Sequence, residues 1–209
     1  KSLWQRIAPE LTELTNTVSV ADVRDLDCFT SAVIDQAAWR QVSAAIEAAQ
    51  ASPTSQIIAG GRVDDRDGWY IWPTIVKSSD PTSLGFTTEY FGPLLNVYVY
   101  PDSEWDFVID LVGSTSPYGL TGSVLSTDRA AIVQATEQLR LAAGNFYIND
   151  KPTGTVVGQQ PFGGSRASGT NDKNGSIWHL CRWLSPRTIK ESFSAPITLN
   201  YPAPRTTTE

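Results

Sequence analysis

The sequence predicts an α/β protein in which a mostly parallel, twisted sheet is flanked by helices. Short strand-like runs alternate with amphipathic segments of helical period along most of the chain. Such alternation is typical of parallel sheets whose strands are joined by helical crossovers. The 209 residues can bury a substantial core in one large unit, and no internal repeat divides them. We assign residues 1–192 to this lobe and residues 193–209 to a C-terminal tail.

The first third of the chain predicts two helices followed by strands. Apolar residues in 2–14 recur every three or four positions, which indicates a helix that Pro9 can kink or divide. Asp35 is a suitable N-cap for a second helix over residues 36–51. Short strands are then expected at residues 56–59 and 69–77.

The remainder of the lobe repeats the alternation of strands and helices. Strands are expected at residues 94–100, 121–125 and 145–149, and a short helical segment at 177–184. Ser103 and Asp106 have the spacing of a capping box and predict the start of a helix. Another helix is expected over 128–143, ended by Gly144. Residues 193–201 alternate weakly and predict a C-terminal edge strand that pairs with a second chain, so we expect a homodimer or higher homo-oligomer.

Composition argues against several functional classes. A formal net charge of −6 disfavours partnership with nucleic acid or with a membrane surface. No apolar run is long enough to span a bilayer and no signal peptide is visible, so we expect a cytoplasmic protein. Two cysteines do not make a disulfide framework. The single histidine, His179, excludes a multi-histidine metal site, and no metal is expected.

One long segment, residues 144–176, is dense in Gly, Thr, Ser and Asn. A compact domain rarely contains such an irregular segment unless it is a binding loop or disordered, and its aromatic and charged residues argue against disorder. Its glycines can turn backbone amides towards an anionic or carbonyl group. The loop follows the strand at 145–149, and ligands of parallel sheets bind where strands end. An Ω-loop packed on itself remains an equally good interpretation.

Four motifs show which family the sequence resembles. Residues 89–94, EYFGPL, resemble the Glu-x-Phe-Gly-Pro motif of aldehyde dehydrogenases, and residues 118–122, YGLTG, resemble another motif of that superfamily. Residues 157–164, VGQQPFGG, and 166–173, RASGTNDK, are similar to the branch that oxidises glutamate semialdehyde, Δ1-pyrroline-5-carboxylate dehydrogenase. The resemblance covers nearly the whole chain. It implies the fold of the C-terminal catalytic domain of that family.

The resemblance also implies roles for five residues. Glu89 matches the glutamate that holds the nicotinamide ribose of NAD, and Phe91 matches the aromatic residue beside the nicotinamide. Gly154 and Thr155 match the clamp on the substrate carboxylate, and Phe162 matches the aromatic wall of the aldehyde pocket. Thr155 replaces a more usual serine, which keeps the hydroxyl and adds a methyl group. Judged without the resemblance, Glu89 can equally be an ordinary surface glutamate, and both phenylalanines can equally be ordinary core residues.

The nucleophilic cysteine, the glutamate base and the NAD-binding Rossmann domain of the family have no match in these residues. No glycine-rich dinucleotide fingerprint is present, and neither Cys28 nor Cys181 matches the position of the nucleophile. We therefore expect a truncated homologue that needs no cofactor and cannot oxidise aldehydes alone. Its former aldehyde pocket or a new interface would serve cyclisation, addition or isomerisation of a small molecule.

Two alternatives to this repurposed enzyme remain open. The chain can be a fragment of an NAD-dependent Δ1-pyrroline-5-carboxylate dehydrogenase, which oxidises glutamate semialdehyde to glutamate and would place it in the mitochondrial matrix. It can also be a scaffold without catalytic activity.

Four residues are weak candidates for catalytic work in a repurposed pocket: His179, Asp150, Lys151 and Cys181. His179 is the only side chain whose unperturbed pKa lies near neutrality, although a lone histidine is commonly structural. Asp150 and Lys151, like the adjacent charges at 172–173, can instead position the loop backbone. Cys181 can be reactive, yet free cysteines are often buried and structural.

Overall fold

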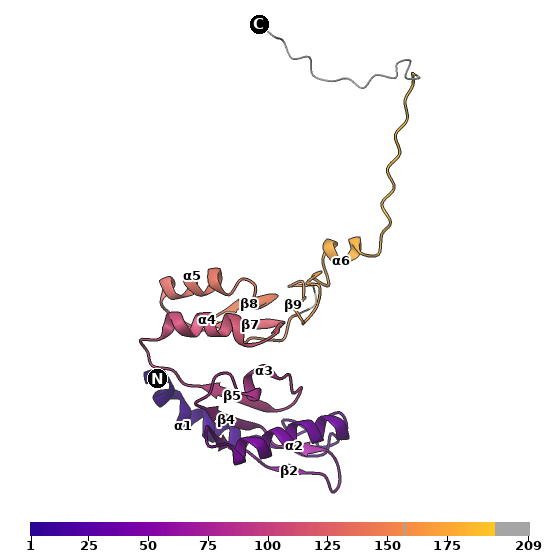
Figure 1. The fold of residues 1–209 in the computed structure, drawn as a ribbon. Helices are drawn as coiled ribbons and strands as arrows, with labels where there is room; N and C mark the ends of the chain where they lie inside the picture. The colour runs from indigo at the N-terminus through magenta and orange to yellow at the C-terminus, as the bar shows by residue number, and fades with distance from the viewer. Residues whose placement is uncertain (157, 195–209) are drawn as a thin grey trace.

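The computed structural model describes residues 1–156 and 158–194 and has the expected α/β architecture (Figure 1). The first half of the chain comprises α1 (Ser2–Thr17), α2 (Gln36–Ala51), β1 (Ser55–Ala59), β2 (Val63–Asp64), β3 (Tyr70–Ile71), β4 (Thr74–Ser78), α3 (Leu84–Thr87) and β5 (Leu94–Tyr98). The second half comprises α4 (Trp105–Thr115), β6 (Tyr118–Gly119), β7 (Thr121–Val124), α5 (Arg129–Gln138), β8 (Asn145–Ile148), β9 (Ser165–Arg166) and α6 (Ile177–Cys181). In Figure 1 the elements from α1 to β5 form the lower group, and those from α4 to β9 form the upper group.

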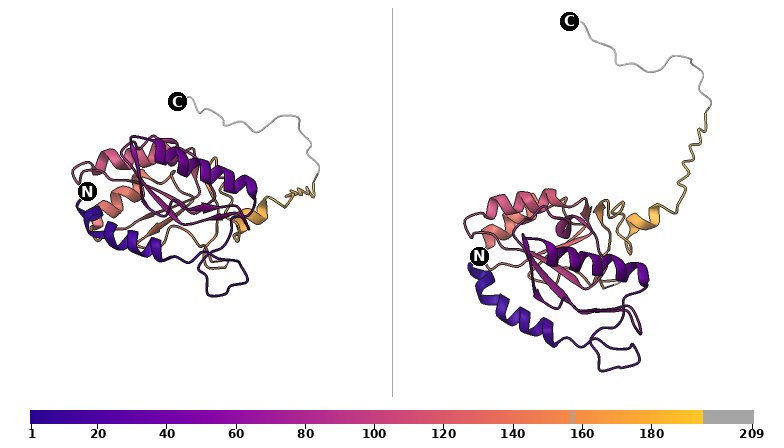
Figure 2. Two further views of the ribbon diagram at one scale, coloured as in Figure 1. Left: turned by 90° about the horizontal axis from the view of Figure 1, so that it is seen from below. Right: turned by 60° about the horizontal axis from the view of Figure 1, so that its bottom comes forward.

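The lower group is built on β4, which pairs antiparallel with β1 and parallel with β5. Thr74, Ile75 and Val76 are each at most 3% exposed. Successive strand side chains point to opposite faces, so both faces of β4 are covered. Helices α1 and α2 both contact β1, and Figure 2 shows them on opposite sides of these strands.

Helix α2 has the bounds that the sequence predicts. The Asp35 carboxylate accepts a hydrogen bond from Ala38 N at 2.8 Å, which caps the first turn. Val42 and Ile46, one turn apart, are buried against Ile71 and form the core of the lower group.

The upper group is built on the parallel pair β7–β8, which helices α4 and α5 cover. Its core joins Ile109 of α4, Ala135 and Leu139 next to or within α5, and Phe146 of β8. The short strands β6 and β9 pair antiparallel beside it. Strand β8 is thereby held on one side by β7 and on one face by the helices.

Three local expectations differ from the structure. The strand expected at 69–77 is divided into β3 and β4, because Pro73 between them has no backbone N–H to donate to a ladder. The capping box is absent: Glu104 is the N-cap of α4 without a side-chain cap bond, and Asp106 instead accepts from Gln134 Nε2 at 2.6 Å. Pro9 lies inside α1 without dividing it.

Gly144 has a different role from the helix stop that the sequence indicates. Helix α5 already ends at Gln138, and residues 139–142 form turns. A Cβ at Gly144 would lie 1.8 Å from the carbonyl oxygen of Gly163, so only glycine permits this backbone approach. The contact brings the start of β8 against the far part of the loop.

The expected C-terminal edge strand falls, from residue 195 onwards, outside the described residues. Within the ranges given above, none of the helices is long and apolar enough to cross a membrane.

Gly144→Ala should lower the free energy of unfolding by about 1–3 kcal/mol or more, because the new methyl group overlaps the Gly163 carbonyl. Gly113→Ala is the matched control: it lies inside α4, and its nearest new neighbour would be Leu139 Cδ2 at 3.9 Å. Urea unfolding measures both. Equal stability of the two variants would contradict the close approach.

Candidate functional site

The loop after β8 encloses a cavity of about 330 Å³. Its lining residues are Thr153, Gly154, Thr155, Gly158, Gln160, Phe162, Asn174 and Gly175. The cavity thus brings together the three residues that the family resemblance assigns to the substrate: Gly154, Thr155 and Phe162. Their role in binding remains a prediction, whereas their shared location is a property of the fold.

Strand β8 fixes the far part of this loop through Asn145, which is only 9% exposed. The Asn145 amide donates to the Pro161 carbonyl at 3.1 Å and accepts from Gly163 N at 3.2 Å. A buried amide with both ends paired stabilises the geometry that pairs it, because leaving either end unpaired is costly.

The same strand holds the near part of the loop through Tyr147. Its hydroxyl lies 2.9 Å from Thr155 Oγ1 and donates to Gln160 Oε1 at 2.9 Å. Asn145 and Tyr147 are two positions apart and therefore share one face of β8, while Phe146 points into the core. Neither Tyr147 nor Gln160 is among the site residues predicted from the sequence. The polar–apolar alternation of β8 is a signal that could have indicated Tyr147, whereas Gln160 lies outside β8 and has no such signal.

Lys173 closes the loop from its other end. Its ammonium donates to the carbonyls of Gly144 and Gly163, the latter at 3.3 Å. Burial lowers the pKa of Lys173 below its usual value. Phe162 N and Asn174 N each donate to the carbonyl of the other residue, at 2.9 and 2.7 Å. These contacts favour the loop-positioning interpretation of Lys173 over acid–base work.

The side chain of Asp172, next to Lys173, also has a structural role. Its carboxylate accepts from Thr170 Oγ1 at 2.6 Å and from Arg182 Nε at 3.0 Å. The hydrogen bond from Thr170, followed by that from Arg182, lowers the pKa of Asp172 despite partial desolvation.

The four weak catalytic candidates lie outside the lining of the loop cavity. His179 lines an adjacent cavity of about 280 Å³, and its Nε2 accepts from Trp183 Nε1 at 3.3 Å. Cys181 is exposed on α6. Asp150 and Lys151 are exposed at the start of the loop. Lys151 nevertheless lies near Gly154, since a Cβ built on Gly154 would be 3.2 Å from its Nζ.

Glu89 and Phe91 lie apart from the loop cavity, between α3 and β5. Both side chains are exposed, Phe91 by 84%, and Phe91 has a φ of 51°. Gln41 of α2 donates to the Glu89 carbonyl at 3.1 Å, and the intervening Tyr90 packs against the core of the lower group. Tyr90 is thus held by the core, and the residues on either side of it, Glu89 and Phe91, expose an acidic and an aromatic side chain.

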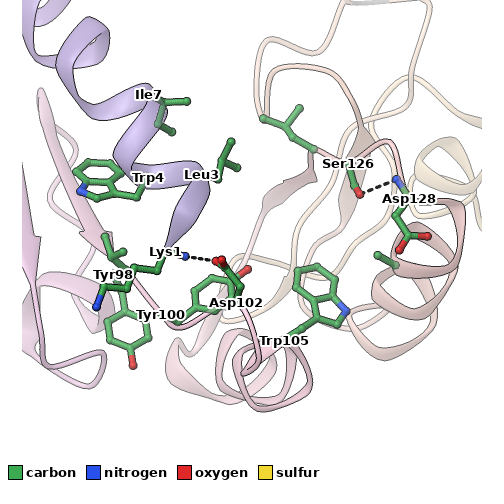
Figure 3. A pocket seen from close by; sticks show the side chains of 13 residues that line it. Lys1, Leu3, Trp4, Ile7, Tyr98, Tyr100, Asp102, Trp105, Ser126 and Asp128 are labelled. Atoms are coloured by element: carbon green, nitrogen blue, oxygen red, sulfur yellow. Dashed lines mark hydrogen bonds and ion pairs between the residues drawn. The ribbon is translucent and has the colours of Figure 1, made fainter.

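A second cavity, of about 400 Å³, lies where α1 faces the start of α4 (Figure 3). Figure 3 shows Trp4, Tyr98, Tyr100 and Trp105 around it. Its polar groups are engaged locally: Asp102 accepts from Ser2 N at 3.1 Å, and Ser126 Oγ accepts from Asp128 N at 3.0 Å. None of the predicted site residues lines it.

Residues 1–189 match the aldehyde dehydrogenase family, and the chain belongs to that family.

The chain is similar to several Δ1-pyrroline-5-carboxylate dehydrogenases. The mitochondrial enzyme of Dictyostelium discoideum is 49% identical over 202 residues, which cover 97% of this chain and 36% of that protein. The mitochondrial enzyme of Homo sapiens is 50% identical over 192 residues, covering 91% of this chain and 34% of that protein. A crystal structure of the Mycobacterium tuberculosis enzyme bound with NAD superposes with a TM-score of 0.84 at 46% identity, covering 96% of this chain and 36% of that one.

The comparisons confirm the family resemblance and its narrower branch. The chain spans about a third of the length of the curated relatives it matches. The comparisons favour the alternative that the chain is a fragment of a dehydrogenase. They lend no support to a repurposed, cofactor-free cyclase or isomerase.

Lys173→Met should lower the free energy of unfolding by about 1–3 kcal/mol, because two partly buried carbonyls lose their charged donor. Lys190→Met, at an exposed position, should change it by less than about 0.5 kcal/mol. Chemical denaturation of both variants measures the difference. If both behave alike, Lys173 does not tie the loop to β8.

Proposed function

We propose that this chain is the part of a Δ1-pyrroline-5-carboxylate dehydrogenase that binds the carboxylate end of glutamate semialdehyde. The whole enzyme would oxidise that aldehyde to glutamate. The observation that carries the proposal is the loop cavity, in which Gly154, Thr155 and Phe162 meet on a frame fixed by β8.

The cavity has the chemistry that a short acid with an apolar chain requires. A carboxylate only accepts hydrogen bonds, so its site must supply donors. The Thr155 hydroxyl is one such donor, and the backbone amides around Gly154 and Gly158, with φ of 82° and 85°, are others. The half-buried ring of Phe162 forms an apolar wall for the methylene chain.

Lys151 adds a positive charge beside the donors. Its ammonium lies close to Gly154, as the 3.2 Å separation from a hypothetical Cβ shows. An ammonium near a residue that lines the cavity attracts an acidic substrate and does not attract a neutral aldehyde. We therefore assign Lys151 to substrate attraction rather than to proton transfer.

The residues at 89–91 fit one end of NAD. When bound, NAD supplies the acceptor for the hydride that leaves the aldehyde carbon. The exposed Glu89 carboxylate can accept hydrogen bonds from both ribose hydroxyls, and the exposed ring of Phe91 can pack on the nicotinamide. The chain carries no glycine-rich phosphate fingerprint, so these residues account for the nicotinamide end alone.

The relatives also bear on location and assembly. Those of Dictyostelium discoideum and Homo sapiens are described as mitochondrial. We propose the same compartment for this protein in place of the cytoplasm. We retain the homo-oligomer as a proposal.

Thr155→Ala, in the complete polypeptide, should raise KM for glutamate semialdehyde by about tenfold or more, because a hydrogen bond to a charged group is lost. Thr155→Ser keeps the hydroxyl and should stay within about twofold of the original protein. Steady-state oxidation with NAD measures KM. A neutral aldehyde of the same length is the control, and an equal rise in its KM would contradict carboxylate binding by Thr155.

Glu89→Gln should raise KM for NAD by about tenfold while leaving KM for the semialdehyde unchanged, since a neutral amide is a poorer acceptor for two hydroxyls. The exposed Glu47→Gln on α2 is the matched control. A rise in KM for both NAD and the semialdehyde, or for neither, would contradict a role of Glu89 in binding the nucleotide.

A further inference from the structure

The side chains of Tyr147, Thr155 and Gln160 form a linear chain of hydrogen bonds that ends at the loop cavity. Tyr147 is at its centre, 2.9 Å from each partner. Both Thr155 and Gln160 line the cavity, whereas Tyr147 is held behind them on β8. Among the described residues, Gln160 makes no other side-chain hydrogen bond.

The number of protons in this chain restricts what Thr155 can do. A tyrosine hydroxyl has one proton, and here it is donated to Gln160 Oε1. The hydrogen bond between Tyr147 and Thr155 then requires Thr155 to be the donor. In this arrangement the Thr155 proton is used, and the hydroxyl offers only lone pairs to the cavity.

Rotation of one amide reverses the direction of the whole chain. If Gln160 turns its NH₂ group to Tyr147, the tyrosine oxygen becomes an acceptor and its proton points to Thr155. Thr155 is then free to donate into the cavity. The oxygen and nitrogen of a glutamine side chain occupy nearly equal volumes, so the reversal needs no repacking.

We propose that Gln160 and Tyr147 are positioning residues that set the polarity of the Thr155 hydroxyl, and that a bound carboxylate selects the reversed arrangement. The inference rests on the proposed function, because it assumes that the ligand in the cavity is an acid. It adds that selectivity for acids depends on Gln160, which this chain separates from the ligand by three hydrogen bonds. Gln160 is suited to this role because rotation of its amide presents either a donor or an acceptor to Tyr147 in the same place.

Two substitutions at Gln160 separate polarity from packing. Gln160→Met removes the amide but keeps its length, which leaves Tyr147 free to donate to Thr155. KM for glutamate semialdehyde should then stay within about threefold of the original protein. Gln160→Glu accepts only, so it locks Tyr147 and Thr155 in the unfavourable direction and should raise KM by about tenfold or more.

The charge added by Gln160→Glu needs its own control. In a Tyr147→Phe background the chain is cut, so the same substitution retains its charge but loses its influence on Thr155. The rise in KM caused by Gln160→Glu should therefore be several-fold smaller in that background. Gln159→Glu, an exposed neighbour outside the cavity lining, should have little effect.

The outcomes are distinct for the two proposals. Absence of NAD-dependent oxidation of glutamate semialdehyde by the complete polypeptide would reject the proposed function. An equal rise in KM in Gln160→Met and Gln160→Glu would contradict the role of Gln160 in setting the polarity of Thr155, but not the proposed function. An undiminished effect of Gln160→Glu in the Tyr147→Phe background would do the same. Calorimetric titration with glutarate measures binding without turnover and should rank the variants in the same way. The affinity for glutarate should be kept in Gln160→Met and should fall about tenfold in Gln160→Glu.

Discussion

The alternation of side chains along β8 is the constraint on which the candidate site depends. Phe146 points into the core between α4 and α5, and this contact fixes the strand. Asn145 and Tyr147, on the opposite face, must then point towards the loop. Packing of this four-residue strand in the core therefore fixes the positions of residues 155–163 in the irregular loop.

This arrangement explains how a glycine-rich loop can be both irregular and preorganised. The loop has few apolar side chains to bury, so polar contacts hold it instead: Asn145 to its far part, Tyr147 to its near part and Lys173 across its base. Each of these contacts involves a group that is costly to leave unpaired away from water. The loop is therefore attached to the sheet and is not an Ω-loop packed only on itself.

The two sets of residues implied by the family occupy different parts of the chain. Gly154, Thr155 and Phe162 belong to the upper group, whereas Glu89 and Phe91 precede β5 of the lower group. Substrate and nucleotide would then approach from separate elements, each anchored to its own core. Such separation is consistent with an enzyme whose reacting atoms meet between structural units, as the proposed function requires.

The sequence by itself determined those features that depend on neighbours a few residues away. These are the α/β class, the bounds of α2 with its Asp35 cap, and the family to which the motifs around Glu89 and Phe162 point. Gly154, Thr155 and Phe162, which the motifs assign to the substrate, lie within nine positions of one another and line one cavity, while their role in binding stays a prediction. Only the tertiary structure decided the end of α5, the approach of Gly144 to Gly163, and the partners of Tyr147 and Lys173. Those partners lie 13 and 29 positions apart. Such contacts exist only once packing has placed β8 beside the loop, and no local propensity encodes them.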